Sequence, residues 1–186
     1  MMGYLRLASL ALVLAVLIMS PMNPGPAAAA TAAEINRDVN SALQKLYARR
    51  PEAKMLAKKA KGILVFPHIV KAGFVVGGQF GEGSLRIKGK TVGYYNTVQA
   101  SYGLQAGAQS YGYALFIMTE SALNYLKKTS GWEIGVGPTV VVVDEGMGKN
   151  LTTTTLRDDI YGFVFDQKGL MAGLGLQGTK ITRIEK

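Results

Sequence analysis

The residues that could carry out acid–base or metal chemistry are few and scattered along this 186-residue sequence. His68 is the one histidine and there is no cysteine, so the usual transition-metal ligands and the usual parts of a nucleophilic site are nearly absent. Two pairs of adjacent acids remain for carboxylate chemistry, Asp144 with Glu145 and Asp158 with Asp159. Such acids at loop ends are usually only solvated. We therefore expect a protein that is not an enzyme and holds no metal.

Two glycine motifs match parts of nucleotide-binding signatures but lack the structure that such sites need. Gly173 to Gly178 has the spacing of the dinucleotide fingerprint, which requires a following helix and a further strand, and too little chain follows Gly178 for either. Gly89-Lys90-Thr91 has the ending of a P-loop, but the first glycine of that motif would fall at Ser84. We expect no nucleotide and no other cofactor.

The strongest local signal is a concentration of basic side chains in and just after the first predicted helices. Glu52 is the only acid between Lys45 and Lys61. A surface of this kind can lie on an anionic membrane, where each lysine or arginine contributes on the order of 1 kcal/mol. The other interpretation is a solvated helix face that keeps the protein soluble. The candidate lipid-binding residues are Lys45, Arg49, Arg50, Lys54, Lys58, Lys59, Lys61 and Lys71.

The composition fits one globular domain with a basic surface. Hydrophobic residues make up 48% of the chain and charged residues 18%, which leaves enough apolar material for a full core. Lysine and arginine number 21 against 12 acids, for a net charge of +9, so the surface favours anionic partners. Nucleic acid is disfavoured among these, because the sequence shows no recognisable nucleic-acid-binding motif.

Residues 1–30 have the organisation of a secretory signal peptide. Arg6 precedes an apolar run from Leu7 to Met19, prolines and a glycine follow, and Ala28 and Ala30 give the small-x-small pattern of a cleavage site. The apolar run is too short to span a bilayer comfortably. We expect an exported protein, cleaved near Ala30, whose single mature domain covers residues 31–186. Without cysteine, that domain has neither disulfides nor a lipid-modified cysteine.

Hydrophobic periodicity predicts an α+β domain that begins with helices. Apolar residues at three- and four-residue spacing predict an amphipathic helix over about residues 33–48, and Pro51 suits the start of a second helix over about residues 51–61. The following short apolar or alternating runs, separated by glycines, predict strands. One further helix is expected near residues 119–130, where Thr119 can serve as its cap.

The strands are expected to form one glycine-rich antiparallel sheet, curled or barrel-like. Lys88-Gly89-Lys90 and the segment 166–169 have the composition of tight hairpin connections, and the segment 144–150 that of a longer loop. Many of the 23 glycines are two residues apart or nearly so, such as Gly81 and Gly83. Glycine at every second position leaves one face of a strand nearly bare. These glycines either let the sheet coil sharply or let another backbone or a flat ligand approach it.

Several ordered segments of the sequence resemble the SYLF domain family. They follow the family's order from an opening signature through a central strand and a glycine-rich strand to a closing hairpin, and the resemblance covers most of the chain from about Ala33 to Ile181. It implies a lipid-binding module, since eukaryotic members bind phosphoinositides through their N-terminal part and yeast-type members also bind actin. The segments are 60–67, 70–78, 103–109, 115–119, 134–138, 161–165 and 168–178.

Carried onto this sequence, the resemblance assigns lipid binding to the basic residues of segment 45–61 and to Lys71. The FYVE or SH3 domains of eukaryotic relatives are missing and a signal sequence is present, so the anionic phospholipids of a bacterial envelope fit better than cytosolic actin or phosphoinositides. We expect a periplasmic or envelope-associated lipid-binding protein. The alternative is a structural or protein-interaction module whose basic face serves solubility. A hydrolase that uses Asp158 and Asp159 is a third hypothesis.

Overall fold

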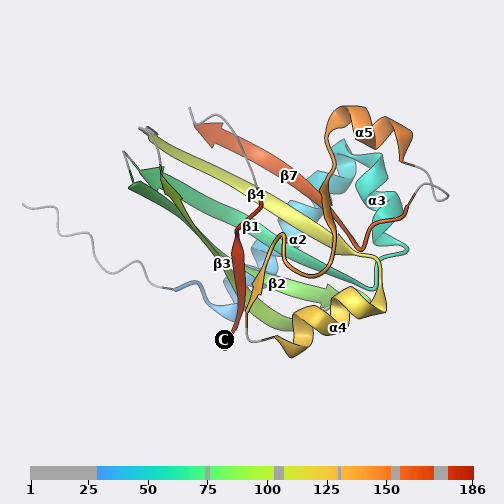
Figure 1. Cartoon of the computed structure of the whole chain (residues 1–186), viewed down its shortest axis with the longest axis horizontal. Helices are drawn as coiled ribbons and strands as arrows, with labels where there is room; N and C mark the ends of the chain where they lie inside the picture. The colour runs from blue at the N-terminus through green and yellow to red at the C-terminus, as the bar shows by residue number, and fades with distance from the viewer. Residues whose placement is uncertain (1–28, 74–75, 103–106, 130, 152–155, 170–175) are drawn as a thin grey trace, which may run out of the picture.

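The computed structural model describes residues 29–73, 76–102, 107–129, 131–151, 156–169 and 176–186 (Figure 1). Eight strands form one sheet in the order β5-β8-β3-β2-β1-β4-β7-β6. The strands are β1 (Gly62–Gly73), β2 (Val76–Ile87), β3 (Lys90–Tyr102), β4 (Gly107–Ile117), β5 (Trp132–Glu133), β6 (Val140–Val142), β7 (Ile160–Gly169) and β8 (Lys180–Ile184). The helices within the described residues are α2 (Ala32–Arg49), α3 (Pro51–Ala57), α4 (Glu120–Lys128) and α5 (Glu145–Asn150).

Some predicted features lie outside the described residues. They are the predicted signal sequence up to residue 28, the glycines at 173–175, and the parts of the SYLF-like segments at 74–75, 103–106 and 170–175. The described residues contain the whole predicted basic segment and the two helices that carry most of it.

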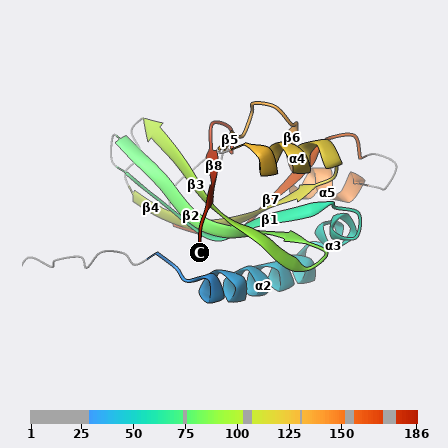
Figure 2. The same cartoon turned by 90° about the horizontal axis from the view of Figure 1, so that it is seen from below.

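The sheet curls so that its two faces meet different helices. Figure 2 shows α4 on the inner side of the curl and α2 on the outer side. Every ladder between described strands is antiparallel except that of β6 with β7. Those two strands are parallel because the connection between them passes through α5 and returns the chain to the same end of the sheet. The predicted α+β class and curled sheet are confirmed, while a purely antiparallel sheet is wrong at this edge.

The curl coincides with an irregularity in the middle of β1. The pairing of β1 with β2 shifts between Val65 and His68. At this point β2 has two glycines: a Cβ on Gly81 would lie 2.7 Å from the His68 carbonyl oxygen, and a Cβ on Gly83 would overlap the Val65 carbonyl oxygen. Glycine therefore lets the two backbones approach where the sheet bends. At these two positions the structure supports the coiling interpretation of the paired glycines.

Strand alternation divides the apolar residues into an inner and an outer core. On β1, Leu64 and Phe66 join the inner core with α4, whereas Val65 joins the outer core with α2 and α3. All three side chains are fully buried. The first half of β1 is thus covered on both faces, and α2 is fixed to the sheet through its own buried stripe, which includes Val39 and Leu46.

Side-chain caps explain where two of the helices begin. The Thr31 hydroxyl accepts a hydrogen bond from the Glu34 N–H, and the Glu34 carboxylate accepts one from the Thr31 N–H, which forms a capping box at the start of α2. Thr119 caps α4 by accepting a hydrogen bond from the Ala122 N–H, as predicted. Both helices lie within two residues of their predicted bounds.

Two other segments differ from their predictions. Helix α3 ends at Ala57 rather than near Lys61, because the Lys61 N–H already donates to the Ile117 carbonyl oxygen at 2.7 Å as the chain enters the sheet. The predicted loop at 144–150 contains the short helix α5. Its start is fixed by the Asp144 carboxylate, which accepts a hydrogen bond from the Met147 N–H at 2.7 Å.

The two predicted hairpin connections have different outcomes. Lys88 and Gly89 form the tight turn between β2 and β3, both with positive φ. The segment 166–169 is not a turn, because it continues β7 alongside β4. Asp166 has a φ of 51° where the pairing of the two strands shifts, and this bulge places Lys168 opposite Ser110.

Candidate functional site

Part of the predicted basic segment lines a groove on the outer face, between α2 and strands β1, β4 and β7. The groove consists of two adjoining hollows of about 260 and 230 Å³ that share Lys45, Arg49 and Asp166. We call them together the basic groove. The first hollow is also lined by Pro67, His68, Ser110, Tyr111 and Lys168, and the second by Leu46, Arg50, Val164 and Phe165.

Helix periodicity and the bulge in β7 bring the cations of the groove together. Lys45 and Arg49 are four residues apart on α2 and both are exposed, while Leu46 between them is buried in the outer core. Lys168 comes from the end of β7, where it is exposed opposite Ser110. Sequence reasoning missed Lys168, because its neighbours have the composition of a turn and its position depends on strand register.

The basic groove has more positive than negative charge among the described residues. Arg49 Nη1 donates to Asp166 Oδ1 at 2.7 Å, so these two charges compensate each other. Within the described part of the chain, no hydrogen bond or ion pair engages Lys45 or Lys168. Two unpaired ammonium groups beside a guanidinium form a suitable site for a phosphate group.

His68 lies at the rim of the groove and is exposed, next to the irregularity of β1. Its Nε2 is 3.9 Å from Asp38 Oδ2 on α2. This is longer than a hydrogen bond, and His68 adds a positive charge to the groove only when it is protonated. His68 lies in the middle of the continuous strand β1 with 78% of its side chain exposed, so it belongs neither to a turn nor to the edge of the core.

Arg50 adjoins the groove, but its guanidinium is engaged within the fold. It pairs with Glu52, and its Nη2 donates to the carbonyl oxygens of Val143 and Asp144 at 3.4 and 3.0 Å. Its guanidinium carbon also lies 5.1 Å from the centre of the Phe163 ring. These contacts join the start of α3 to the segment that precedes α5, so few donors of Arg50 remain for a lipid.

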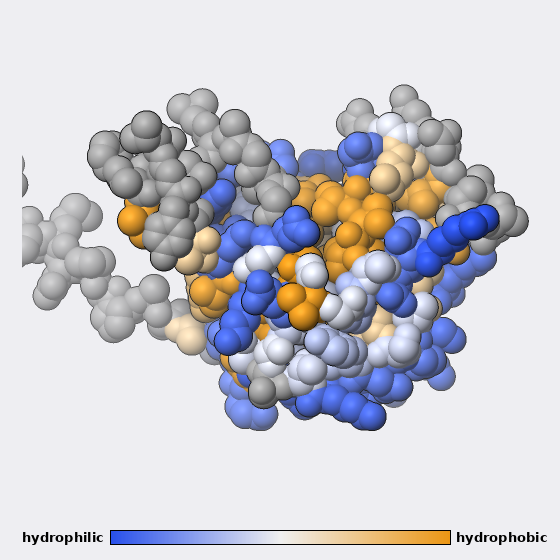
Figure 3. Space-filling view, in the orientation of Figure 1, coloured by the Kyte–Doolittle hydropathy of each residue, from blue (hydrophilic) through white to orange (hydrophobic). Residues whose placement is uncertain are grey.

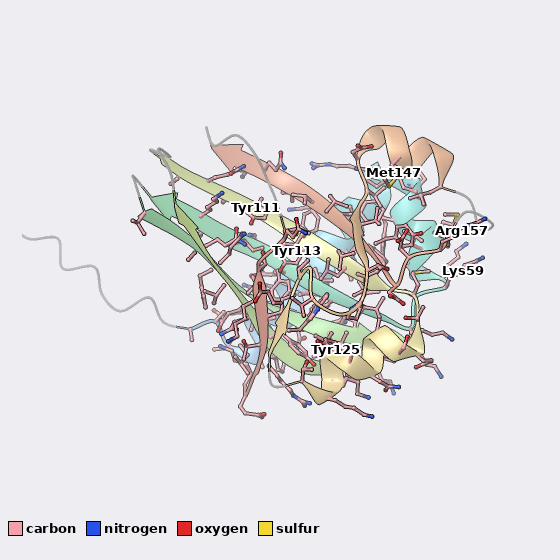
Figure 4. The ribbon with its side chains drawn as sticks, viewed as in Figure 1. Lys59, Tyr111, Tyr113, Tyr125, Met147 and Arg157 are labelled. Carbon is pink, nitrogen blue, oxygen red and sulfur yellow. The ribbon has the colours of Figure 1, made fainter. Side chains whose placement is uncertain are left out.

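Four other predicted lysines lie away from the groove. Lys54 is on α3, Lys58 and Lys59 follow α3, and all three are exposed. Lys61 pairs with Glu120 of α4 at 3.6 Å. Figure 4 shows Lys59 near one end of the molecule, far from the opposite ends of β1 to β4. The predicted basic segment is therefore not one continuous face.

Lys71 lies on the inner face of the sheet, separate from the groove. It pairs across strands with Gln79 and Gln109, and 9% of its surface is exposed. Gln79 Oε1 accepts a hydrogen bond from the Tyr111 hydroxyl, while Gln109 Oε1 has no partner in the described part of the chain. Burial raises the pKa of Tyr111 to about 12, so the hydroxyl remains a donor at neutral pH. Lys71 thus belongs to a polar row inside the curl.

Asp144 and Asp159, two of the four acids considered for carboxylate chemistry, have structural partners. Asp144 caps α5, and Asp159 accepts hydrogen bonds from Thr119 Oγ1 at 2.8 Å and from the Thr139 N–H at 3.1 Å. These bonds, that from Thr119 above all, hold the pKa of the Asp159 carboxyl below its usual value. In the part of the chain that the structure describes, no three His, Cys, Asp or Glu residues are grouped to hold a metal ion.

A hollow of about 480 Å³, larger than either hollow of the basic groove, lies on the side of the molecule opposite α2. It has no charged side chain among its lining residues, and Figure 3 shows apolar surface at the centre of this side, between the places of β7 and α4 in Figure 1. Its lining mixes polar groups, including the side chains of Thr139 and Gln177, with apolar ones, and it offers no charged side chain that would pair with a charged ligand. It is lined by Ile134, Gly135, Gly137, Pro138, Thr139, Val140, Val142, Leu176 and Gln177.

Comparisons with known proteins match the second half of the chain. Residues 98–186 match the family model described as Ysc84, Las17-binding protein actin regulator. The matched part begins in β3 and contains Lys168 of the basic groove, but not Lys45 or Arg49. A search of curated proteins finds no match to the chain. No helix within the described residues is long and apolar enough to cross a membrane.

Proposed function

Residues 98–186 belong to the Ysc84 (SYLF) family, and on this premise we propose that the protein binds anionic phospholipid at a membrane surface and catalyses no reaction. The family is lipid- or actin-related. The observation that carries the proposal is the basic groove, in which Lys45 and Lys168 are unpaired beside Arg49. A phosphodiester headgroup offers the acceptor oxygens that these donors lack.

Charge attraction from the groove supports binding that is reversible. Lys45 and Lys168, whose charges are uncompensated, contribute about 1 kcal/mol each near an anionic surface, or roughly thirtyfold in affinity for the two together. Salt screens such interactions over about 8 Å at physiological ionic strength. The proposed binding is therefore strong at low salt and weak at high salt.

The proposed site of action is the cell envelope, with a bacterial periplasm as the specific expectation. This part of the proposal is supported by residues 1–30, which have the organisation of a signal peptide. Arg6 is the only charged residue in that segment, so its removal lowers the net charge of +9 by one and leaves the basic character with the mature domain.

Vesicle flotation tests the proposal with two variants of equal charge change. The mature chain, residues 31–186, contains every described helix and strand. It should float with vesicles that contain phosphatidylglycerol and remain behind with vesicles of phosphatidylcholine alone. Lys45→Gln with Lys168→Gln should weaken binding to the anionic vesicles about thirtyfold, since two cations near the surface are removed.

The matched control is Lys58→Gln with Lys59→Gln, which removes the same charge from exposed positions outside the groove. This variant should bind within about threefold of the unmodified chain. An equal loss of vesicle affinity in both variants would mean that the overall charge of the protein, and not the basic groove, determines binding. Failure of the unmodified chain to float with either vesicle would overturn lipid binding itself.

Protein interaction is the second candidate function. The description of the family model names Las17 binding and actin regulation, and apolar residues that could meet a protein are exposed on the sheet, Phe80 among them. Under this candidate the two charge variants would behave alike and neither vesicle would bind the chain.

A further inference from the structure

Helix α2 covers only part of the outer face of the sheet. At its N-terminal end the Ala30 N–H donates to Glu82 Oε2 on β2 at 3.0 Å. Beyond this point β1 to β4 continue toward their far ends, and Figure 2 shows them extending past the start of α2 with no described helix beneath them. The outer face of these strand ends is therefore uncovered by the described part of the chain.

Apolar side chains occupy this uncovered region. Val70 of β1, Phe80 of β2 and Val98 of β3 are direct neighbours across the strands and are 57%, 52% and 44% exposed. Val76, the first residue of β2, is 62% exposed. We call these four residues the bare apolar face. Large contiguous apolar patches are uncommon on the surface of soluble monomers, and where they occur they mark interaction sites.

The residues next to this row make the surface flat. Ala72, Gly78 and Ala100 follow one another across β1, β2 and β3 and are all exposed. A Cβ on Gly78 would have its nearest neighbour at 3.6 Å, so packing does not require glycine there. None of the residues that line this shallow region is charged. A flat apolar surface without a deep pocket suits a broad apolar phase better than a small ligand.

Positive charge is found at both ends of the row formed by Val70, Phe80 and Val98. Strand pairing continues it to Lys168 of the basic groove on one side and to Lys180 on the other, and both are exposed. Lys180 also faces Glu133 across β8 and β5, so the groove is the more positive end. Glu82, farther along β2, is paired with Lys186 at 2.8 Å, which compensates its charge.

We propose that the bare apolar face inserts into the acyl-chain boundary of an anionic bilayer, while Lys168 and the basic groove lie at the level of the headgroups. This inference rests on the proposed function and adds to it an orientation and an apolar contact. The occupant is a bilayer because the surface combines an apolar centre with a cationic rim, which matches the chemistry of an interface between acyl chains and anionic headgroups.

A tryptophan reporter tests the insertion. Phe80→Trp places an indole on the bare apolar face at a side chain that is already half exposed, and the native Trp132 is buried and supplies a constant background. The control is Val142→Trp, at an exposed position beside the hollow of the other side. Both variants of the mature chain are mixed with phosphatidylglycerol vesicles whose acyl chains carry bromine, a contact quencher of tryptophan.

The Phe80→Trp signal should shift to the blue and lose about half its intensity, because interfacial residues reach the first part of the acyl region. The Val142→Trp signal should stay unchanged. A second variant, Phe80→Asp, should bind these vesicles about tenfold more weakly while keeping the circular dichroism of the unmodified chain.

Other outcomes would overturn the inference. Flotation with no quenching at position 80 would leave the proposed function intact and refute insertion of this face. If, in the absence of vesicles, the Phe80→Trp fluorescence shifts to the blue as the protein concentration rises, the occupant is a second copy of the chain. If the Phe80→Trp fluorescence is blue-shifted without vesicles in the chain of residues 1–186 but not in the chain of residues 31–186, the occupant of the bare apolar face is the N-terminal segment. No flotation at all would refute the proposed function together with the inference.

Discussion

Replacing Gly83 with alanine tests the physical origin of the curl that creates the two faces. The added Cβ would lie 2.8 Å from the Val65 carbonyl carbon and 2.9 Å from Cδ1 of Phe66, and closer still to the Val65 oxygen. Backbone atoms of β1 cannot move away without disturbing its irregular pairing with β2. Overpacking of this kind costs about 1–3 kcal/mol and sometimes more, so we expect a loss of about 3 kcal/mol in the free energy of unfolding.

Gly78→Ala is the matched control on the same strand. Its added Cβ would have no atom nearer than 3.6 Å, and the loss of chain entropy in the unfolded state favours the variant by up to about 1 kcal/mol. Urea denaturation followed by circular dichroism measures both changes, and the midpoint of thermal unfolding should fall by about 6–12 °C for Gly83→Ala. If the Gly83→Ala protein is as stable as the Gly78→Ala protein, the close approach of β1 and β2 does not require glycine at position 83.

Two further predictions concern residues that were candidates for function and have structural partners. Asp159→Asn should lower the free energy of unfolding by about 1 kcal/mol at pH 7, after allowance for solvent screening. Because the pKa of Asp159 is lowered in the folded protein, its ionised carboxylate stabilises the fold at pH values above its ordinary pKa of 3.8. This stabilisation is lost as the pH falls through the pKa of the folded state. The free energy of unfolding should therefore fall less steeply with acid in Asp159→Asn than in the unmodified chain. Arg50→Met should destabilise the fold by about 2 kcal/mol in urea denaturation, because Glu52 and two carbonyl oxygens lose their donor, whereas Lys54→Met at an exposed position should stay within about 0.5 kcal/mol. Equal stability of the two methionine variants would contradict the structural assignment of Arg50.

The features that the sequence predicted well are those with strong local signals. The periodic apolar residues of α2 and the threonine caps of α2 and α4 act through neighbouring residues, so a short window contains the information. The turn at Lys88 and Gly89 is local in the same way. The segment 166–169 was misjudged because its composition favours a turn, while its pairing with β4 is set by strands more than fifty residues away in sequence.

The division of the basic residues between surfaces could not be predicted from the sequence alone. Charge counting treats Lys45 and Lys71 alike, but a residue's face on a strand depends on register and on each bulge that precedes it. The irregularity near His68 decides that Lys71 points inward and Val70 outward. Lys168 joins Lys45 only through a second bulge at Asp166, which has no signature in a single sequence.

The central claim is that lipid binds the outer face of the sheet, at the bare apolar face and the basic groove. The most direct measurement is photo-crosslinking of the mature chain to vesicles that contain a phosphatidylglycerol with a diazirine in its acyl chain, followed by peptide mapping. Label should concentrate on peptides that contain Val70, Val76 to Phe80 and Val98. Label concentrated instead on α4 or on the Ile134–Val142 segment beside the other hollow would contradict the claim and would place lipid on the inner side of the molecule.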